Sequence, residues 1–163
     1  MSRIPSLGPR GEGWVALQFV MLWLVVAGTV AGSTFVIADP GIGQAIRATG
    51  LVLLALGALV VVWGVVALRR VGSFTVLPHP SAAGRLAESG PYRFVRHPVY
   101  AGLIAAAFGA TLKELSLLGV VAAIGLFIVL DLKRRREEAW LRERFAAYDA
   151  YRGRTKGLVP FVY

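Results

Sequence analysis

The sequence contains no cysteine and only two histidines, His79 and His97. Without cysteine the chain has no disulfide framework, no thiolate nucleophile and no thiolate metal site. Two histidines are too few for a histidine-built metal centre unless carboxylates join them, so we expect no metal site. No G-x-G-x-x-G loop follows a strand pattern, which excludes a Rossmann-type nucleotide-binding domain.

Charge is also scarce, because charged residues make up only 17% of the chain. The basic residues outnumber the acidic ones, at 18 Lys and Arg against 9 Asp and Glu. A soluble basic protein usually spreads its cations over the whole surface, whereas here they form blocks between apolar runs. No nucleic-acid-binding signature accompanies these blocks. The pattern therefore favours membrane lipid as a partner and argues against nucleic acid.

Long apolar runs dominate the first half of the chain. Hydrophobic residues make up 56% of the 163 residues, above the roughly 45–50% of a soluble domain. The uncharged runs 14–38 and 48–68 are each long enough for a transmembrane helix, which needs about 20 residues. The first run is too long for the apolar part of a signal peptide. We therefore expect two retained membrane helices, joined by a turn at the proline- and glycine-containing stretch 39–43.

The second half predicts another pair of membrane helices and a charged tail. Residues 69–97 are polar and contain several prolines and glycines, which predicts a cytoplasmic connector along the membrane surface. Pro98 suits the first position of a new helix. The apolar runs 98–112 and 115–132 then predict a hairpin of two shorter membrane helices. Residues 133–163 predict an amphipathic helix that leaves the membrane, with a short aromatic end that folds back.

The distribution of basic residues predicts the orientation. With four spans, 16 of the 18 Lys and Arg residues fall on one side, and the positive-inside rule makes that side cytoplasmic. We therefore expect an all-α integral membrane bundle of about four transmembrane helices with a cytoplasmic C-terminal amphipathic helix. Both termini would be cytoplasmic, in a membrane such as the bacterial inner membrane.

Several charged and aromatic residues also have a purely structural interpretation. Arg96 and the aromatic residues near it are typical of a membrane edge. The pair Glu137-Glu138 could serve only in surface ion pairs, and the basic run 133–136 would anchor the chain to anionic lipid. At helical spacing Glu137, Leu141, Arg144, Tyr148 and Tyr151 share one face of the predicted tail helix.

Two motifs on either side of the predicted hairpin carry a family resemblance. The first supplies Gly90, Tyr92, Arg96, His97, Pro98, Tyr100 and Gly102, and the second supplies Glu137, Glu138, Leu141, Phe145, Tyr148, Tyr151 and Pro160. Together they resemble the isoprenylcysteine carboxyl methyltransferase family, whose broader group includes the phospholipid N-methyltransferases. The resemblance covers about residues 71–161. The chain departs from the pattern at Ala146, where the family usually has glycine, and at 154–156, which is usually more apolar.

The resemblance implies that S-adenosylmethionine binds at the cytoplasmic face and that its methyl group passes to a lipid-like acceptor, leaving S-adenosylhomocysteine. The cofactor carries a carboxylate, an ammonium, a sulfonium and an adenine, so it requires a cation, an anion and an aromatic wall. Arg96 or His97 would hold the carboxylate. Glu137 or Glu138 would hold the ammonium.

The remaining motif residues would shape the site. Tyr100, Tyr148 or Tyr151 would pack on the adenine or line the sulfonium. Pro98 would fix the mouth of the third membrane helix at the depth of the membrane surface. Gly102, one turn further into that helix, would leave room for close approach of the cofactor.

The acceptor decides which residues take part in the chemistry. A carboxylate acceptor of the isoprenylcysteine type, which we favour, requires no base, and Arg96 would hold it. An amine of a phospholipid requires a proton acceptor, for which Glu138 is the candidate. A sterol-reductase-like enzyme and a non-enzymatic membrane protein are the remaining alternatives.

Small residues in the third predicted membrane helix have two interpretations. Gly102, Ala105, Ala106 and Gly109 recur at about one-turn spacing. Such residues usually mark close packing between membrane helices, which is the interpretation we favour. The alternative is a slot for an acyl or prenyl chain.

Overall fold

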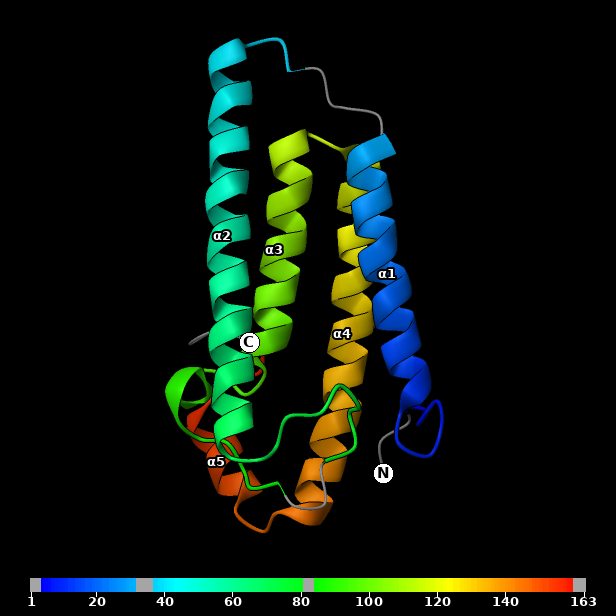
Figure 1. Cartoon of the computed structure of the whole chain (residues 1–163), viewed down its shortest axis with the longest axis vertical. Helices are drawn as coiled ribbons and strands as arrows, with labels where there is room; N and C mark the ends of the chain where they lie inside the picture. The colour runs from blue at the N-terminus through cyan, green and yellow to red at the C-terminus, as the bar shows by residue number, and fades with distance from the viewer. Residues whose placement is uncertain (1–3, 32–36, 81–83, 160–163) are drawn as a thin grey trace.

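The computed structural model describes residues 4–31, 37–80 and 84–159. Four long helices run antiparallel to their neighbours along the chain (Figure 1): α1 Glu12–Ala31, α2 Pro40–Arg70, α3 Pro98–Glu114 and α4 Leu117–Arg144. A short 3₁₀ helix, η1 Gly90–Arg93, and the helix α5 Tyr148–Arg154 lie at one end of this bundle. The described residues form no β-strand, so the prediction of an all-α protein is confirmed.

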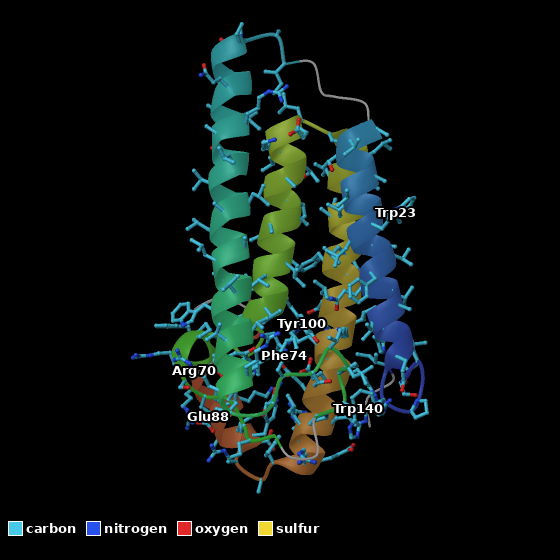
Figure 2. All side chains as sticks on the ribbon, in the orientation of Figure 1. Trp23, Arg70, Phe74, Glu88, Tyr100 and Trp140 are labelled. Atoms are coloured by element: carbon cyan, nitrogen blue, oxygen red, sulfur yellow. The ribbon has the colours of Figure 1, made fainter. Side chains whose placement is uncertain are left out.

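Two of these helices, α1 and α2, are long and apolar enough to cross a membrane. Their outer faces expose large apolar side chains, and Trp23, which is 67% exposed, projects away from the bundle (Figure 2). The inner faces of the bundle are packed around Val25, Ala107, Leu126 and Leu130, all buried. Apolar side chains on both the inside and the outside are typical of a bundle solvated by lipid.

The bounds of the first two helices differ from the predicted ones. α1 ends at Ala31, before the predicted limit at residue 38, and residues 32–36 of that prediction lie outside the described part of the chain. The predicted turn at 39–43 is wrong, because α2 begins at Pro40 instead of residue 48. The carboxylate of Asp39 caps this helix by accepting a hydrogen bond from the Ile42 amide at 3.0 Å. A capping aspartate followed by proline starts a helix, and only the residues before Pro40 remain in the turn.

The predicted division between a membrane helix ending at 132 and a separate tail helix is also wrong. α4 continues through this point to Arg144. Residues 133–144 are mostly good helix formers, and ion pairs across one turn support them, such as Asp131 to Arg135 at 2.7 Å. One rigid helix therefore connects the apolar part of the bundle to the charged end.

The tail does not form a single helix. At Phe145 the backbone becomes extended, with φ −117° and ψ 109°, and the chain turns before α5 begins. Tyr148 and Tyr151 therefore lie on α5 and do not share a helix face with Glu137, contrary to the prediction. The turn nevertheless brings the residues of both helices to the same cavity.

α2 packs against α3 through glycines that are seven residues apart. A Cβ atom added to Gly57 would lie 2.5 Å from the Ala106 amide nitrogen, and one added to Gly50 would overlap the Lys113 amide nitrogen. The two backbones are therefore in direct contact. In a membrane such close approach supplies the van der Waals packing that replaces the hydrophobic effect between helices.

The small residues of α3 form the other side of this contact. A Cβ atom on Gly102 would lie 2.7 Å from the Gly57 carbonyl oxygen, and one on Gly109 would overlap the Leu54 amide nitrogen. The interpretation of these glycines as packing residues is confirmed. Ala105 lines a groove described below, as does Gly102.

Candidate functional site

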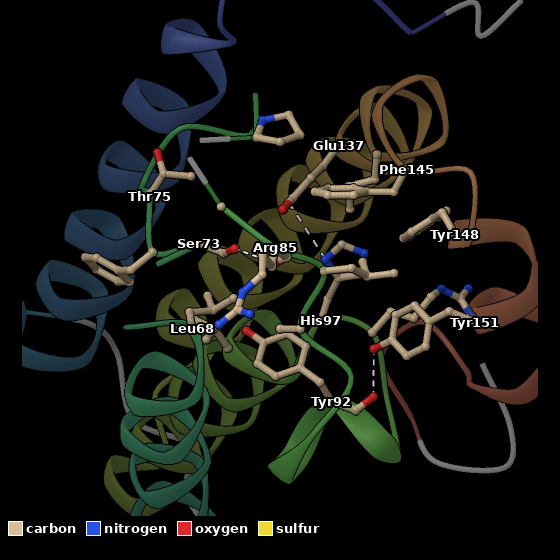
Figure 3. A pocket seen from close by; sticks show the side chains of 18 of the residues that line it. Leu68, Ser73, Thr75, Arg85, Tyr92, His97, Glu137, Phe145, Tyr148 and Tyr151 are labelled. Atoms are coloured by element: carbon tan, nitrogen blue, oxygen red, sulfur yellow. Dashed lines mark hydrogen bonds and ion pairs between the residues drawn. The ribbon is translucent and has the colours of Figure 1, made fainter. Parts of the chain in front are cut away.

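A cavity lies at the α5 end of the bundle, between the end of α2, the connector, the start of α3 and the end of α4 (Figure 3). We call it the polar pocket. Its charged and ionisable lining residues are Arg85, Arg96, His97 and Glu137. Its aromatic lining residues are Phe74, Tyr92, Tyr100, Phe145, Tyr148 and Tyr151. Six of the predicted site residues thus meet here, namely Arg96, His97, Tyr100, Glu137, Tyr148 and Tyr151.

The C-terminal segment fixes the backbone of the first motif. After α5 the chain forms an isolated parallel bridge between Val95 and Lys156, whereas the aromatic end predicted to fold back lies outside the described residues. The Arg96 amide donates to the Lys156 carbonyl oxygen at 2.8 Å, and the His97 amide donates to the Gly157 carbonyl oxygen at 3.1 Å. α3 then begins at Pro98. The predicted motif residue Pro160 lies outside the described residues.

Glu138 lies in a buried ionic cluster behind the polar pocket. Its Oε1 atom is 3.1 Å from Arg96 Nε, 3.2 Å from Arg134 Nη1 and 3.3 Å from His97 Nε2. Burial alone would raise the pKa of Glu138, but His97 and Arg96 outweigh it and hold this pKa well below its usual range. Glu138 is therefore ionised at neutral pH. It does not line the pocket.

Arg96 is held by the same cluster. Its guanidinium also donates to the backbone carbonyl oxygens of Arg152 and Thr155. The side chain is only 9% exposed. Arg96 therefore lines the pocket, but most of its N–H groups already donate to Glu138 and to backbone carbonyl oxygens.

Glu137 faces the polar pocket. Its Oε2 atom accepts a hydrogen bond from the Tyr100 hydroxyl at 2.7 Å and lies 3.8 Å from His97 Nδ1 (Figure 3). The Tyr100 ring stacks on the His97 ring, with centroids 5.4 Å apart and planes at 9°. An anion, an ionisable imidazole and an aromatic face therefore stand together on one wall.

One buried polar atom of the pocket lining, the Tyr148 hydroxyl, has no hydrogen-bond partner among the described residues. An unsatisfied buried group costs about 1–3 kcal/mol. Burial and the charge of Glu138 raise the pKa of Tyr148 far above its usual range, so its hydroxyl remains a donor at neutral pH. By contrast, the Tyr151 hydroxyl donates to the Tyr92 carbonyl oxygen at 2.7 Å. The unpartnered Tyr148 hydroxyl indicates that a polar ligand completes the site.

A second, larger cavity lies between α2 and α3, and we call it the apolar groove. It encloses about 450 Å³, against about 120 Å³ for the polar pocket. Its lining includes Trp63, Phe94, Pro98, Gly102 and Ala105. No described residue lines both cavities, because the segment 91–102 separates them. The structure thus places Pro98 and Gly102, predicted at the cofactor, on the groove side of that segment.

Arg85 is a pocket residue that the sequence motifs do not identify. It belongs to the connector, and its side chain lies beside Tyr92 and Leu68 (Figure 3). Ser73 donates to the Arg85 carbonyl oxygen, which links two distant parts of the connector. Nothing local in the sequence marks Arg85, because its position depends on how the connector folds over the pocket.

The fold and the two cavities define a helical membrane protein that has a small-molecule pocket next to a lipid-sized groove. The model of the phospholipid methyltransferase family matches residues 45–148, more than half of the chain, and the protein belongs to this family. Members of this family use S-adenosylmethionine as methyl donor, so the protein is an S-adenosylmethionine-dependent methyltransferase. It acts on lipid-like substrates in a membrane. A comparison with curated proteins finds no match.

Proposed function

We propose that the polar pocket binds S-adenosylmethionine at the membrane surface. The observation that carries this proposal is the grouping of Glu137, His97 and an aromatic wall around a cavity, where the Tyr148 hydroxyl has no hydrogen-bond partner among the described residues. The cofactor offers an ammonium, a carboxylate, a sulfonium and an adenine, which match these groups in charge and shape.

Individual roles follow from where each side chain lies. Glu137 receives the ammonium, because it is the carboxylate among the described lining residues. Arg85 provides positive charge for the carboxylate, and His97 stands on the same lining as a candidate hydrogen-bond donor. Tyr148 and Tyr151 pack against the adenine or the sulfonium, and the free Tyr148 hydroxyl donates to a polar atom of the cofactor.

Arg96 and Glu138 support the site from behind. Their ion pair at 3.1 Å links the first motif to α4, and both side chains are nearly fully buried. Tyr100 then holds Glu137 by its hydrogen bond. When bound, the cofactor supplies an electrophilic methyl group. In the displacement that transfers this methyl group, the protein contributes alignment of the reactants and exclusion of water. The fixed side chains of the pocket provide the alignment, and the connector that covers the pocket excludes water.

We propose further that the hydrocarbon part of the acceptor lies in the apolar groove. Trp63, Phe94 and Phe127 give this groove an apolar lining. A lipid-like chain enters it from the bilayer, while the cofactor enters the polar pocket from the cytoplasm. The reactive end of the acceptor must then pass the segment 91–102 to meet the methyl group.

We favour a carboxylate acceptor of the isoprenylcysteine type. Methylation of a carboxylate needs no base, whereas an amine must lose a proton. Glu138 is a poor proton acceptor, since its pKa is held low and it does not line the pocket. Glu137 is occupied by the cofactor ammonium in this proposal. Methylation of a phospholipid amine is the second candidate, favoured by the family match itself.

The acceptor is tested with radiolabelled S-adenosylmethionine and the purified protein in vesicles. We expect label to be transferred to a farnesylated cysteine derivative and the product to be labile to base, as a methyl ester is. Transfer to phosphatidylethanolamine vesicles, with a label that base does not release because it is bound to nitrogen, would instead establish the amine as the acceptor. Absence of S-adenosylhomocysteine binding in calorimetry would contradict the proposed cofactor site.

We also propose that all four long helices span the membrane and that both termini are cytoplasmic. α3 and α4 run alongside α1 and α2 (Figure 1), and the segments that carry most of the Lys and Arg residues lie at the α5 end of the bundle. A bacterial inner membrane is the expected location. Reporter fusions after Tyr163 and in the turn before Pro40 should report opposite sides. A report of the same side from both fusions would exclude this topology.

A further inference from the structure

The ammonium of Lys133 is buried behind the wall of the polar pocket. The residue is only 1% exposed. Its Nζ donates to Gln18 Oε1 at 2.6 Å and to the Val76 carbonyl oxygen at 3.2 Å. Both partners are neutral, so the charge is solvated by dipoles instead of by a paired carboxylate. Burial of a cation without a paired carboxylate costs folding free energy, so a functional role for Lys133 would explain its position.

Lys133 and Glu137 lie one turn apart on the same face of α4. Tyr100, from α3, lies across this turn. Its ring centroid is 5.1 Å from Lys133 Nζ, and its hydroxyl donates to Glu137 at 2.7 Å. Burial lowers the pKa of Lys133 to about 8, and the negative charge of Glu137 opposes this shift. Lys133 and Glu137 therefore interact electrostatically and hold the same tyrosine between them.

The two hydrogen bonds of Lys133 connect α4 to two other parts of the chain, helix α1 and the connector. Gln18 is on α1, where it is buried at 7% exposure and does not line the pocket. Val76 belongs to the connector and directly follows Ser73, Phe74 and Thr75, which do line the pocket. One ammonium thus links α1 and the pocket-covering part of the connector to α4.

We propose that Lys133 is a positioning residue for cofactor binding. It anchors the connector over the polar pocket and sets Tyr100 against Glu137, and it does not touch the cofactor. This proposal rests on the assignment of the polar pocket to S-adenosylmethionine. Without the ammonium, the connector loses its bond at Val76 and opens more readily, so the bound cofactor dissociates faster.

The test uses S-adenosylhomocysteine as the probe and the full chain in detergent. Calorimetry measures affinity, and hydrogen exchange measures protection of the amides at 73–77. In the wild type, bound probe should slow exchange in this segment. Lys133→Met should weaken binding by on the order of tenfold, because it removes charge-assisted contacts, and the ligand-induced protection should disappear. Lys113→Met is the matched control, because Lys113 lies at the end of α3 that is far from the polar pocket. This variant should bind the probe as the wild type does.

Glu137→Gln separates this proposal from the one on which it rests. If Glu137→Gln binds weakly while Lys133→Met keeps wild-type affinity and protection, the cofactor site stands and the role of Lys133 is excluded. If Glu137→Gln binds as the wild type does, the cofactor site itself is wrong, and the role of Lys133 is excluded with it.

A second variant covers the case in which Lys133→Met does not fold. Gln18→Leu removes one partner of the ammonium from a helix that does not line the pocket. We expect it to weaken binding of the probe by about threefold or more, because it leaves a buried donor unsatisfied. Wild-type affinity in a folded Gln18→Leu protein, with unchanged protection of 73–77, would overturn the proposal.

Discussion

Glu137 and Glu138 are adjacent in the sequence but project from α4 into different surroundings. The Glu137 carboxylate faces the polar pocket and accepts the Tyr100 hydroxyl at 2.7 Å. The Glu138 carboxylate is buried, within 3.3 Å of side-chain nitrogens of Arg96, Arg134 and His97. The rotation of about 100° between successive helix residues separates a ligand-facing carboxylate from a structural one.

Substitution of each glutamate by glutamine should therefore give opposite results. Glu137→Gln should leave the unfolding temperature nearly unchanged and weaken S-adenosylhomocysteine binding by about tenfold or more, because a charge-assisted contact is lost. Glu138→Gln should destabilise the protein by about 3 kcal/mol, since it leaves buried arginines without their counter-charge. Calorimetry and thermal unfolding in detergent measure the two effects. Equal losses of stability in both variants would contradict the assignment.

A tyrosine pair on α5 offers a second test. Tyr148→Phe removes a hydroxyl that has no partner among the described residues, so it should not lower stability in the ligand-free protein. It should nevertheless weaken cofactor binding by several-fold, because the cofactor supplies the missing partner. Tyr151→Phe is the matched control, and it should lower stability by about 1 kcal/mol through loss of the bond to Tyr92. Unchanged affinity in Tyr148→Phe would show that its hydroxyl does not meet the cofactor.

Sequence patterns were sufficient for the features that depend on local signals. Run length and hydropathy predict the helices, and Pro98 marks the start of α3. The two motifs name nine of the 19 residues that line the polar pocket. The sequence did not distinguish Glu137 from Glu138, because that choice depends on the rotation of α4 against α3. Nor did it identify Arg85, whose place depends on the path of the connector.

The apolar groove gives a third prediction. Ala105→Leu should fill part of the groove and reduce methyl transfer to a long-chain acceptor by about tenfold, with cofactor affinity and unfolding temperature unchanged. Gly50→Ala is the packing control, because a Cβ atom there would overlap the Lys113 backbone and should lower stability. Radiolabelled turnover and thermal unfolding separate the outcomes. Loss of stability in Ala105→Leu would mean that Ala105 packs instead of lining a substrate path.

The low pKa of Lys133 predicts a dependence of stability on pH. Folded Lys133 titrates near pH 8, whereas in the unfolded chain it titrates near 10.5. Between these values the unfolded state binds more protons, so the contribution of Lys133 to the free energy of unfolding rises with pH. Lys133→Met should lack this rise. The difference in unfolding temperature between wild type and variant is measured from about pH 7.5 to about pH 10, and a constant difference would contradict the burial of the charge.

The sequence also contains a local signal for the contact between α2 and α3, which the predictions above do not include. Gly43, Gly50, Gly57 and Gly64 recur every seven residues and are all buried in α2. This period is close to two helical turns, so it places the glycines on one side of the helix. Such a pattern indicates the packing face of α2. It also explains why the glycines at the start of α2 belong to a helix and not to a turn.

The bridge between Val95 and Lys156 has a consequence for how the enzyme is made. Ribosomes synthesise the chain from its N-terminus, so α1 to α4 are complete before residues 155–158 exist. Until those residues emerge, the Arg96 and His97 amides lack the carbonyl oxygens that hold them. A chain in which residues 155–158 have not yet docked therefore has an unfinished wall at the proposed cofactor site. Completion of this wall is a late step of folding, because it joins segments about 60 residues apart in the sequence.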